Sequence, residues 1–249
     1  MKIKKLWVLL LSACLGLGTL VAQDINNLMQ AVQKGDAKAQ DTLGLMYAFG
    51  QGVPQDYVQA VKWYRLAVDQ GYAQAQLNLG NMYRNGRGVP QDYVQAVKLY
   101  RLAADQGDAQ AQNNLAVMYD SGQGVPQDYV QAVKLYRLAA DQGYAEAQSN
   151  LGVMYYRGEG VPQDYVQAAK WHHLAADQGL ALVQSNLGNM YFQGRGVPQD
   201  FVQAHMWYNL AAAQGDANGT KNRDTIAKLM TPQQIGQAQE LARNWKPKQ

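Results

Sequence analysis

Apolar and small residues recur at intervals of three and four positions in two successive segments of residues 72–107. The first segment is 73–83 and the second is 93–104. This period is that of an α-helix with one buried face, so the sequence predicts two helices. Gly88 and Pro90 lie between them and interrupt the pattern, because proline disfavours a helical conformation in the residue before it. The sequence has no run of alternating β-branched residues, so no strand is expected.

The same hairpin pattern returns five times along the chain. Its clearest marker is the pentapeptide Gly-Val-Pro-Gln-Asp, which recurs unchanged every 36 residues and begins at Gly52, Gly88, Gly124, Gly160 and Gly196. A fixed period of this length is typical of an array of stacked units. A single hairpin cannot bury both of its faces, so neighbouring hairpins must supply the missing contacts, and the sequence predicts a solenoid. We expect full repeats at 36–71, 72–107, 108–143, 144–179 and 180–215.

Segments that depart from the period flank the array and are expected to cap it. Residues 24–35 match the end of a repeat and predict an amino-terminal capping helix. Residues 216–249 begin like a first helix but become polar, and they predict carboxy-terminal capping helices. In that region Thr231, Pro232 and Gln234 stand at the positions that a capping box uses at the start of a helix. Terminal units with a polar outer face keep a solenoid soluble.

Single residues within each repeat are expected to end the helices and bring them together. Asp92 would favour the positive end of the second helix from its first turn, and Gly107 would end that helix. Asp108 stands where it could cap the following first helix, whereas Tyr72 at the equivalent position could not. A small residue such as Gly80 recurs inside each first helix. It lowers helix propensity but should let a neighbouring helix approach closely.

Three segments of the repeat together resemble a known family. They are Ala-x-Ala-Gln-x-x-Leu-Gly-x-Met-Tyr at 73–83, Gly-x-Gly-Val-Pro-Gln-Asp at 86–92 and Gln-Ala-x-Lys-x-Tyr-x-x-Ala-Ala-x-Gln-Gly at 95–107. This combination resembles the Sel1-like repeat, a relative of the tetratricopeptide repeat. The resemblance covers residues 36–215 and implies an all-α fold, an α/α superhelical solenoid. It also implies a non-enzymatic bacterial scaffold, often exported, that binds a peptide or partner protein on its concave surface.

A cysteine-rich branch of that family, linked to the binding or hydrolysis of β-lactams, gives the alternative function. Members of that branch carry one disulfide in each repeat. Cys14 is the only cysteine of this chain, so it departs from that branch. Removal of a signal peptide would leave no thiol nucleophile and no cysteine ligand for zinc. No serine-hydrolase, β-lactamase or zinc-protease motif is present either, so we expect no enzymatic activity and no cofactor.

The amino terminus has the composition of an export signal. A basic start is followed by an apolar run over 6–20, and Ala22 offers a small residue for cleavage, so residues 1–22 are expected to be a signal peptide. The run of about 15 apolar residues is shorter than the roughly 20 that a membrane-spanning helix needs. Residues 11–14 resemble a lipobox, so the alternative is a lipoprotein anchored through Cys14. The expected location is the periplasm or the medium, or the envelope in the lipidated form.

The net charge of +3 lies entirely in this amino-terminal segment. Without Lys2, Lys4 and Lys5, the basic and acidic side chains are equal in number, at 19 each. Binding to nucleic acid needs a basic face that displaces the counterions of the phosphates, so no nucleic-acid partner is expected. We expect a protein or peptide partner and a monomeric scaffold.

Candidate partner-binding residues lie on the first helix of each repeat, where the resemblance places the concave wall. Asparagine recurs there before the buried leucine, and its amide can both donate to and accept from a peptide backbone. The alternative is that these amides bond to neighbouring helices and support the superhelix. The candidates are Asn78, Asn81, Arg84, Asn114, Asn150, Tyr156, Arg157, Asn186, Asn189 and Phe192.

The three histidines are expected to be structural or to lie on the surface. His172 replaces a core tyrosine of the other repeats, His173 replaces an exposed arginine or asparagine, and His205 replaces valine or alanine. Neighbouring residues of a helix point in different directions, so His172 and His173 cannot form a metal-binding pair. No metal site is expected.

Overall fold

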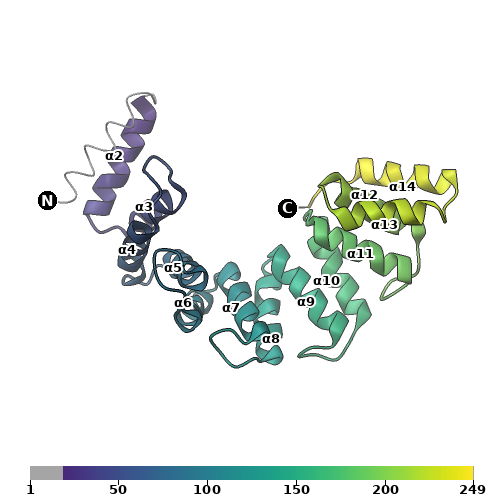
Figure 1. Ribbon diagram of the computed structural model, residues 1–249, viewed down its shortest axis with the longest axis horizontal. Coiled ribbons are helices and arrows are strands. Elements are labelled where there is room, and N and C mark those ends of the chain that lie inside the picture. The colour runs from purple at the N-terminus through teal and green to yellow at the C-terminus, as the bar shows by residue number, and fades with distance from the viewer. Residues whose placement is uncertain (1–18, 249) are drawn as a thin grey trace. The chain divides into compact units, whose positions relative to one another are not determined.

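The computed structural model describes residues 19–248, and every regular element in that range is a helix (Figure 1). The chain divides into two compact units, 1–127 and 128–249, at the turn between α7 and α8. The described helices of the first unit are α2 (Thr19–Gln33), α3 (Ala37–Phe49), α4 (Tyr57–Val68), α5 (Ala73–Asn85), α6 (Tyr93–Asp105) and α7 (Ala109–Ser121). Those of the second are α8 (Tyr129–Asp141), α9 (Ala145–Arg157), α10 (Tyr165–Asp177), α11 (Ala181–Gln193), α12 (Phe201–Ala213), α13 (Ala217–Ala227) and α14 (Pro232–Asn244). The expected all-α fold of repeated hairpins is confirmed.

The structure describes only a small part of the expected signal peptide. Cys14 and most of the expected signal segment, 1–22, lie outside the described residues. Helix α2 begins at Thr19, within that segment, and packs against α3. None of the helices described is both long and apolar enough to cross a membrane.

The helix ends follow from the aspartates and glycines of the repeat. Asp92 lies one position before its helix, and its carboxylate accepts from the backbone N–H of Gln95 at 3.0 Å, so it is the N-cap rather than a residue of the first turn. Asp108 caps α7 by accepting from the N–H of Ala111 at 2.7 Å. Tyr72 stands at the equivalent place before α5 and makes no side-chain cap, as expected. The capping box at the start of α14 is also confirmed.

The small residue inside the first helix allows the aromatic ring of the second helix to approach. A Cβ added to Gly80 would lie 2.7 Å from Cε1 of Tyr100, and one added to Gly188 would lie 2.6 Å from the ring of Tyr208. These tyrosines are buried. The close approach expected at Gly80 is therefore made by a ring of the same repeat.

A second close contact joins each repeat to the one before it. In repeats two to five, the glycine of the recurring pentapeptide has a positive φ and lies against the amino end of the preceding repeat's second helix. A Cβ on Gly88 would lie 2.2 Å from the carbonyl oxygen of Tyr57, and one on Gly196 would lie 1.9 Å from that of Tyr165. No side chain larger than that of glycine fits there without movement of the backbone.

Polar side chains also link successive repeats at equivalent places. Arg65 donates to the Tyr83 hydroxyl at 2.9 Å. In the second unit, His173 stands at the arginine position, and its Nε2 lies 2.9 Å from the Tyr191 hydroxyl. His173, expected to be structural or to lie on the surface, is half-buried and takes part in this contact between repeats.

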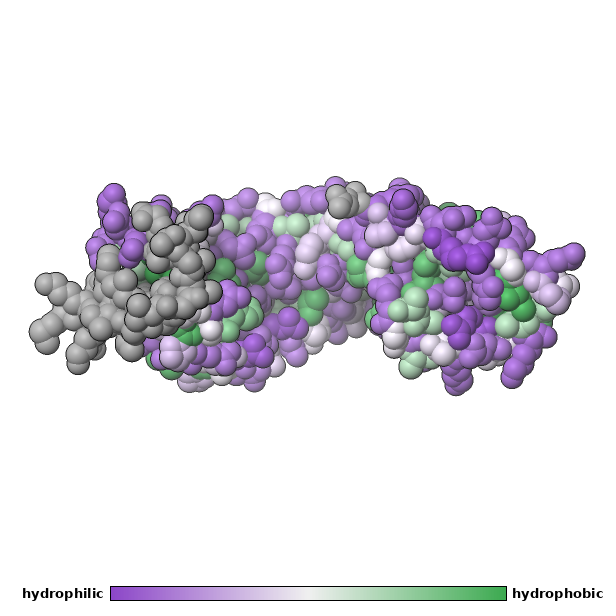
Figure 2. All heavy atoms as spheres, turned by 90° about the horizontal axis from the view of Figure 1, so that it is seen from above, coloured by the Kyte–Doolittle hydropathy of each residue, from purple (hydrophilic) through white to green (hydrophobic). Residues whose placement is uncertain are grey.

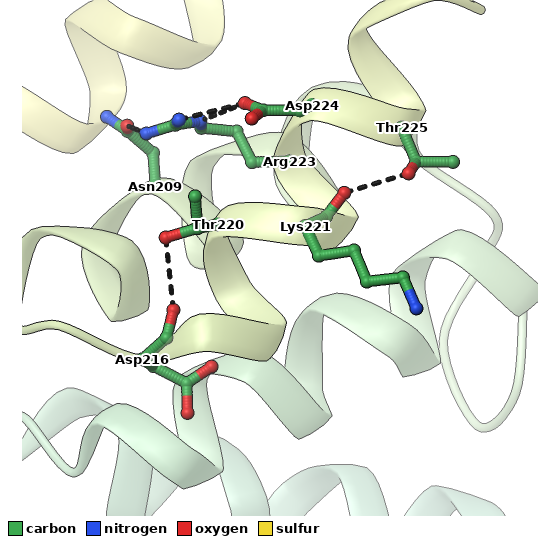
Figure 3. A network of polar contacts seen from close by, with 7 residues as sticks. All are labelled: Asn209, Asp216, Thr220, Lys221, Arg223, Asp224 and Thr225. Carbon is green, nitrogen blue, oxygen red and sulfur yellow. Dashed lines mark hydrogen bonds and ion pairs between the residues drawn. The ribbon is translucent and has the colours of Figure 1, made fainter.

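Helix α13 starts as another first helix, and its polar face carries the network drawn in Figure 3. Only Gly219 and Ile226 of this helix are buried. Arg223 donates to the carboxylate of Asp224 at 2.8 Å and to the side-chain oxygen of Asn209 at 3.4 Å (Figure 3). The expected polar character of the terminal unit arises from these residues.

Helix α14 packs on α12 and covers its outward row of Val202, Met206 and Leu210. In repeat four, the residue at the position of Met206 is Lys170, which is exposed. Repeat five is thus apolar along the row that the last helix covers. Ala238 of α14 is fully buried in this contact.

Replacing Met206 with lysine is expected to detach α14, because the ammonium group would be buried without a partner. Hydrogen exchange should then show loss of protection in α14, while α9 and α10 keep theirs. Lys170→Met is the matched control, since nothing described covers that position, and it should leave the protection of α14 unchanged. Unchanged protection in Met206→Lys would contradict the proposed role of this row.

Candidate functional site: two matched pockets

A pocket of about 270 Å³ opens between α9 and α11 in the second unit, with the second helix of repeat four behind it. Its wall is made by first helices of two successive repeats, and His172 of α10 contributes to its lining. Polar and apolar side chains alternate around it. The lining residues are Val153, Tyr156, Arg157, His172, Asn186, Asn189, Met190 and Gln193.

The first unit has a pocket of about 220 Å³ at the equivalent place, between α3 and α5. Eight of its ten lining residues lie 108 positions, or three repeats, before a lining residue of the second-unit pocket. The lining residues are Leu45, Ala48, Phe49, Tyr57, Tyr64, Asn78, Asn81, Met82, Asn85 and Arg87. An equivalent cavity is thus present in each unit, and the two cavities differ in their side chains.

Asparagine side chains in both pockets are oriented by bonds to the protein. The carbonyl oxygen of Asn189 accepts from the Tyr208 hydroxyl at 2.7 Å and from Nδ2 of Asn222 at 3.1 Å. In the first unit, the oxygen of Asn81 accepts from the Tyr100 hydroxyl at 2.8 Å. Since the oxygens are occupied, the amide groups that remain free to bond are the NH₂ donors.

The second asparagine of each pocket differs between the units. Asn78 donates to the buried carboxylate of Asp41 at 2.9 Å. The side chain of Asn186 forms no hydrogen bond with any described residue, and Ser149 occupies the position of Asp41. The amide of Asn78 is therefore hydrogen-bonded to a neighbouring helix. The amide of Asn186 can both donate to a ligand and accept from it.

His172 in the second-unit pocket is a buried and neutral side chain. It is 3% exposed, and its Nδ1 has no hydrogen-bond partner among the described residues. Burial, with a smaller contribution from the nearby His173, lowers the pKa of His172 to about 4. The ring packs on Gly152 in the place that tyrosine takes in the other repeats. Val153 lines the pocket beside it and cannot accept a hydrogen bond as Asn81 and Asn189 do in repeats two and five.

Arg157 and Tyr156 line the edge of this pocket, and Arg195 lies close to it. Arg157 has a side chain that is 62% exposed and pairs with Glu159 at 3.6 Å. The guanidinium of Arg195 bonds to the hydroxyl of Tyr156 and lies 5.8 Å from the centre of the Tyr165 ring. Tyr156 also packs edge-on against Tyr165, so its ring is held in place.

Six of the ten candidate residues line the two pockets. Asn78 and Asn81 line the first-unit pocket, and the second-unit pocket is lined by Tyr156, Arg157, Asn186 and Asn189. Asn114 donates to Asn81 at 3.4 Å, which fits the alternative that asparagines support the stack of helices.

The other candidates lie on first helices outside these pockets. Arg84 and Asn150 are half-buried. Phe192 stacks on Phe201 with ring centres 5.7 Å apart. A role for these residues in partner binding stays a prediction.

Sequence reasoning placed His172 in the core but did not place it in a pocket. The signal that could have found it is the replacement of the core tyrosine by His172 in repeat four, since the position of Val153 is also apolar in repeats one and three. Where Asn81 faces Tyr100 and Asn189 faces Tyr208 within one repeat, repeat four has Val153 and His172. The imidazole of His172 is shorter than the tyrosine ring, and Val153 cannot accept a hydrogen bond as the asparagine does. Both differences change the side chains that surround the cavity.

Stability should fall on acidification because of His172. Its folded-state pKa is below its unfolded-state value, so the unfolded chain binds a proton first as the pH falls. The stabilisation is complete above about pH 6.5 and is lost progressively towards pH 4, by about 3 kcal/mol. Urea unfolding at several pH values should show a smaller loss in His172→Tyr, which restores the residue of the other repeats. An equal loss in both proteins would contradict this assignment.

No group of three or more His, Cys, Asp or Glu side chains within residues 19–248 is placed to hold a metal ion. The described pockets instead offer amide, guanidinium and aromatic groups. Such groups can bind a ligand, and none of the pocket residues forms a nucleophile–base pair.

Comparison with known proteins supports the fold of repeated helical hairpins. The Sel1 repeat family matches at 37–72, 73–108, 109–144, 145–180 and 181–216, one residue later than the bounds expected from the sequence. No curated protein is significantly similar in sequence.

Several solved structures are similar over most of the chain. The protein c5321, a protective antigen present in uropathogenic Escherichia coli strains and displaying an SLR fold, is 39% identical with a TM-score of 0.80, covering 89% of this chain and 48% of c5321. This chain therefore spans about half the length of c5321. A Sel1 repeat protein from Oxalobacter formigenes is 32% identical with a TM-score of 0.77, covering 91% of this chain and 92% of that protein.

An immunity protein from Pseudomonas aeruginosa, Pa5087, shares the fold at 22% identity and a TM-score of 0.50, covering 83% of this chain and 81% of that protein. Five consecutive family matches, the repeated hairpins of the structure and the two Sel1-type relatives agree. The chain belongs to the Sel1 repeat family.

Proposed function

We propose that this protein is an exported, non-enzymatic scaffold that binds a peptide or partner protein on its first-helix face. The observation that carries the proposal is the recurrence of one pocket, with free amide donors, at the same place in each unit. Sel1 repeats form a scaffold fold typical of protein-interaction modules. Figure 2 shows small hydrophobic patches among hydrophilic residues on the face it displays, a mixture common in non-obligate interfaces.

Site-specific photo-crosslinking would test where a partner binds. A photoreactive phenylalanine analogue at Gln193, on the pocket edge, should cross-link a protein of the producing cell's envelope. The same analogue at Leu174, which is exposed on the second helix of repeat four, should give little of that product. Cross-linking mainly from Leu174 would place the partner on the other face and contradict the proposal.

Export is supported by the composition of residues 1–22, and its test is the amino terminus of the protein recovered from cells. Cleavage after Ala22 predicts a mature chain that begins at Gln23 and takes up no palmitate label. A palmitate label lost in Cys14→Ala would establish the lipid-anchored alternative. An unprocessed and unlabelled chain would contradict export by either route.

The rival function is the β-lactam chemistry linked to the cysteine-rich branch. The cysteines of that branch are missing from this sequence. Incubation with a chromogenic β-lactam should therefore give no turnover above a heat-inactivated control. Clear turnover would make the protein an enzyme and contradict the proposal.

A further inference from the structure

We propose that the pocket between α9 and α11 binds a carboxylate group of the partner. This inference rests on the proposed function and adds the chemistry of what enters the second-unit pocket. A carboxylate could come from an aspartate or glutamate side chain or from the carboxyl terminus of the partner. Both sources present the same acceptor oxygens, so the experiment below separates them.

The first argument is an excess of donors. Asn189 has its oxygen occupied by two protein donors and can offer only its NH₂ group to the pocket. The side chain of Asn186 has no hydrogen-bond partner among the described residues, so it offers a further NH₂ group in addition to its oxygen. A carboxylate is acceptor-only and can take several such bonds at once.

The second argument is charge. Arg157 lies in the lining, and its pairing with Glu159 at 3.6 Å is exposed, so that pairing is weak and easily exchanged. Arg195 does not line the pocket, but its guanidinium is held against Tyr156 of the lining and against Tyr165, so it adds a second positive charge nearby. No acidic side chain lines the pocket. Charge-assisted bonds from guanidinium to carboxylate are among the stronger polar contacts in proteins.

The third argument is the contrast with the first-unit pocket. Phe49, 67% exposed, stands where the second unit has Arg157, and Ala48 stands where it has Tyr156. Asp41 is bonded to Asn78 beside that pocket, and its negative form would repel a second carboxylate. The first-unit pocket thus has an aromatic ring in place of Arg157 and an acid bonded to one of its asparagines, although Arg87 also lines it. The second-unit pocket has Arg157 in its lining and Ser149 in place of that acid.

The test is a titration of the isotope-labelled protein followed by the side-chain amide signals of Asn186 and Asn189. The probes are N-acetylglutamate amide, N-acetylglutamine amide and N-acetylalanine with a free carboxyl group. We expect saturable shifts with at least one carboxylate probe, and binding at least about tenfold weaker for the glutamine probe. A response to the glutamate probe indicates an acidic side chain, and a response to N-acetylalanine alone indicates a carboxyl terminus.

Two substitutions localise the effect. Arg157→Phe introduces the residue of the first-unit pocket and should weaken carboxylate binding at least about tenfold. Arg243→Phe, on the exposed face of α14, makes the same change in net charge and should have no effect. Asn186→Asp places a carboxylate in the pocket without breaking any bond to a described residue, and it should abolish binding.

Equal shifts with the glutamate and glutamine probes would overturn the inference, as would the absence of saturable shifts with both carboxylates. It would also be overturned if Arg157→Phe bound the responding probe as tightly as the unsubstituted protein. Cross-linking from Gln193 is independent of these titrations. If it succeeds while the titrations fail, the proposed function stands and only the carboxylate assignment is wrong.

Discussion

Replacing Gly196 with alanine is expected to lower the free energy of unfolding by about 3 kcal/mol or more. Two costs add. The residue has a φ of +72°, which costs an alanine about 1–2 kcal/mol, and its Cβ would lie 1.9 Å from the carbonyl oxygen of Tyr165. Relief of that overlap requires a shift of the backbone of the preceding repeat, and overpacking of this kind costs about 1–3 kcal/mol. Urea unfolding followed by circular dichroism measures the sum.

Gly143→Ala is the matched control for this prediction. Gly143 has a φ of +87°, yet a Cβ built there meets nothing within 4 Å. Only the conformational cost should remain, so the loss should be about 1–2 kcal/mol. Equal losses for Gly196→Ala and Gly143→Ala would show that the close contact between repeats contributes nothing.

Replacing Tyr208 with alanine is expected to cost about 3–5 kcal/mol, the usual range for removing a large buried aromatic side chain. The tyrosine is 2% exposed and packs on Gly188 within its own repeat. Gly188 has no side chain that could fill the cavity. Asn189 would also lose a hydroxyl donor at 2.7 Å. Thermal and urea unfolding should both show the loss.

Tyr208→Phe separates the ring from its hydroxyl. It keeps the packing on Gly188 and removes only the bond to Asn189, so the expected cost is about 1 kcal/mol. The released Asn189 amide should also respond differently to a carboxylate probe. A cost for Tyr208→Phe as large as that for Tyr208→Ala would mean that the hydrogen bond, and not the packing, stabilises this position.

Part of the site could be predicted from the sequence because it depends on repeat position alone. Asn186 and Asn189 were expected on one helix face from their spacing, and both line the second-unit pocket. His172 could not be placed there from its spacing, because its neighbours come from a different helix. The hydrogen bond from Asn78 to Asp41 could not be predicted from the sequence either, since these residues belong to different repeats.

The sequence by itself determined the helical hairpins, their number and their caps. Local signals are sufficient for this: the period of apolar residues, Asp108 before a helix and glycine after one. Only the tertiary structure decided which cavities remain between the hairpins and which amides in them stay free. These depend on side chains brought together from three helices, such as Val153, His172 and Asn189, and spacing along one helix carries no information about such meetings.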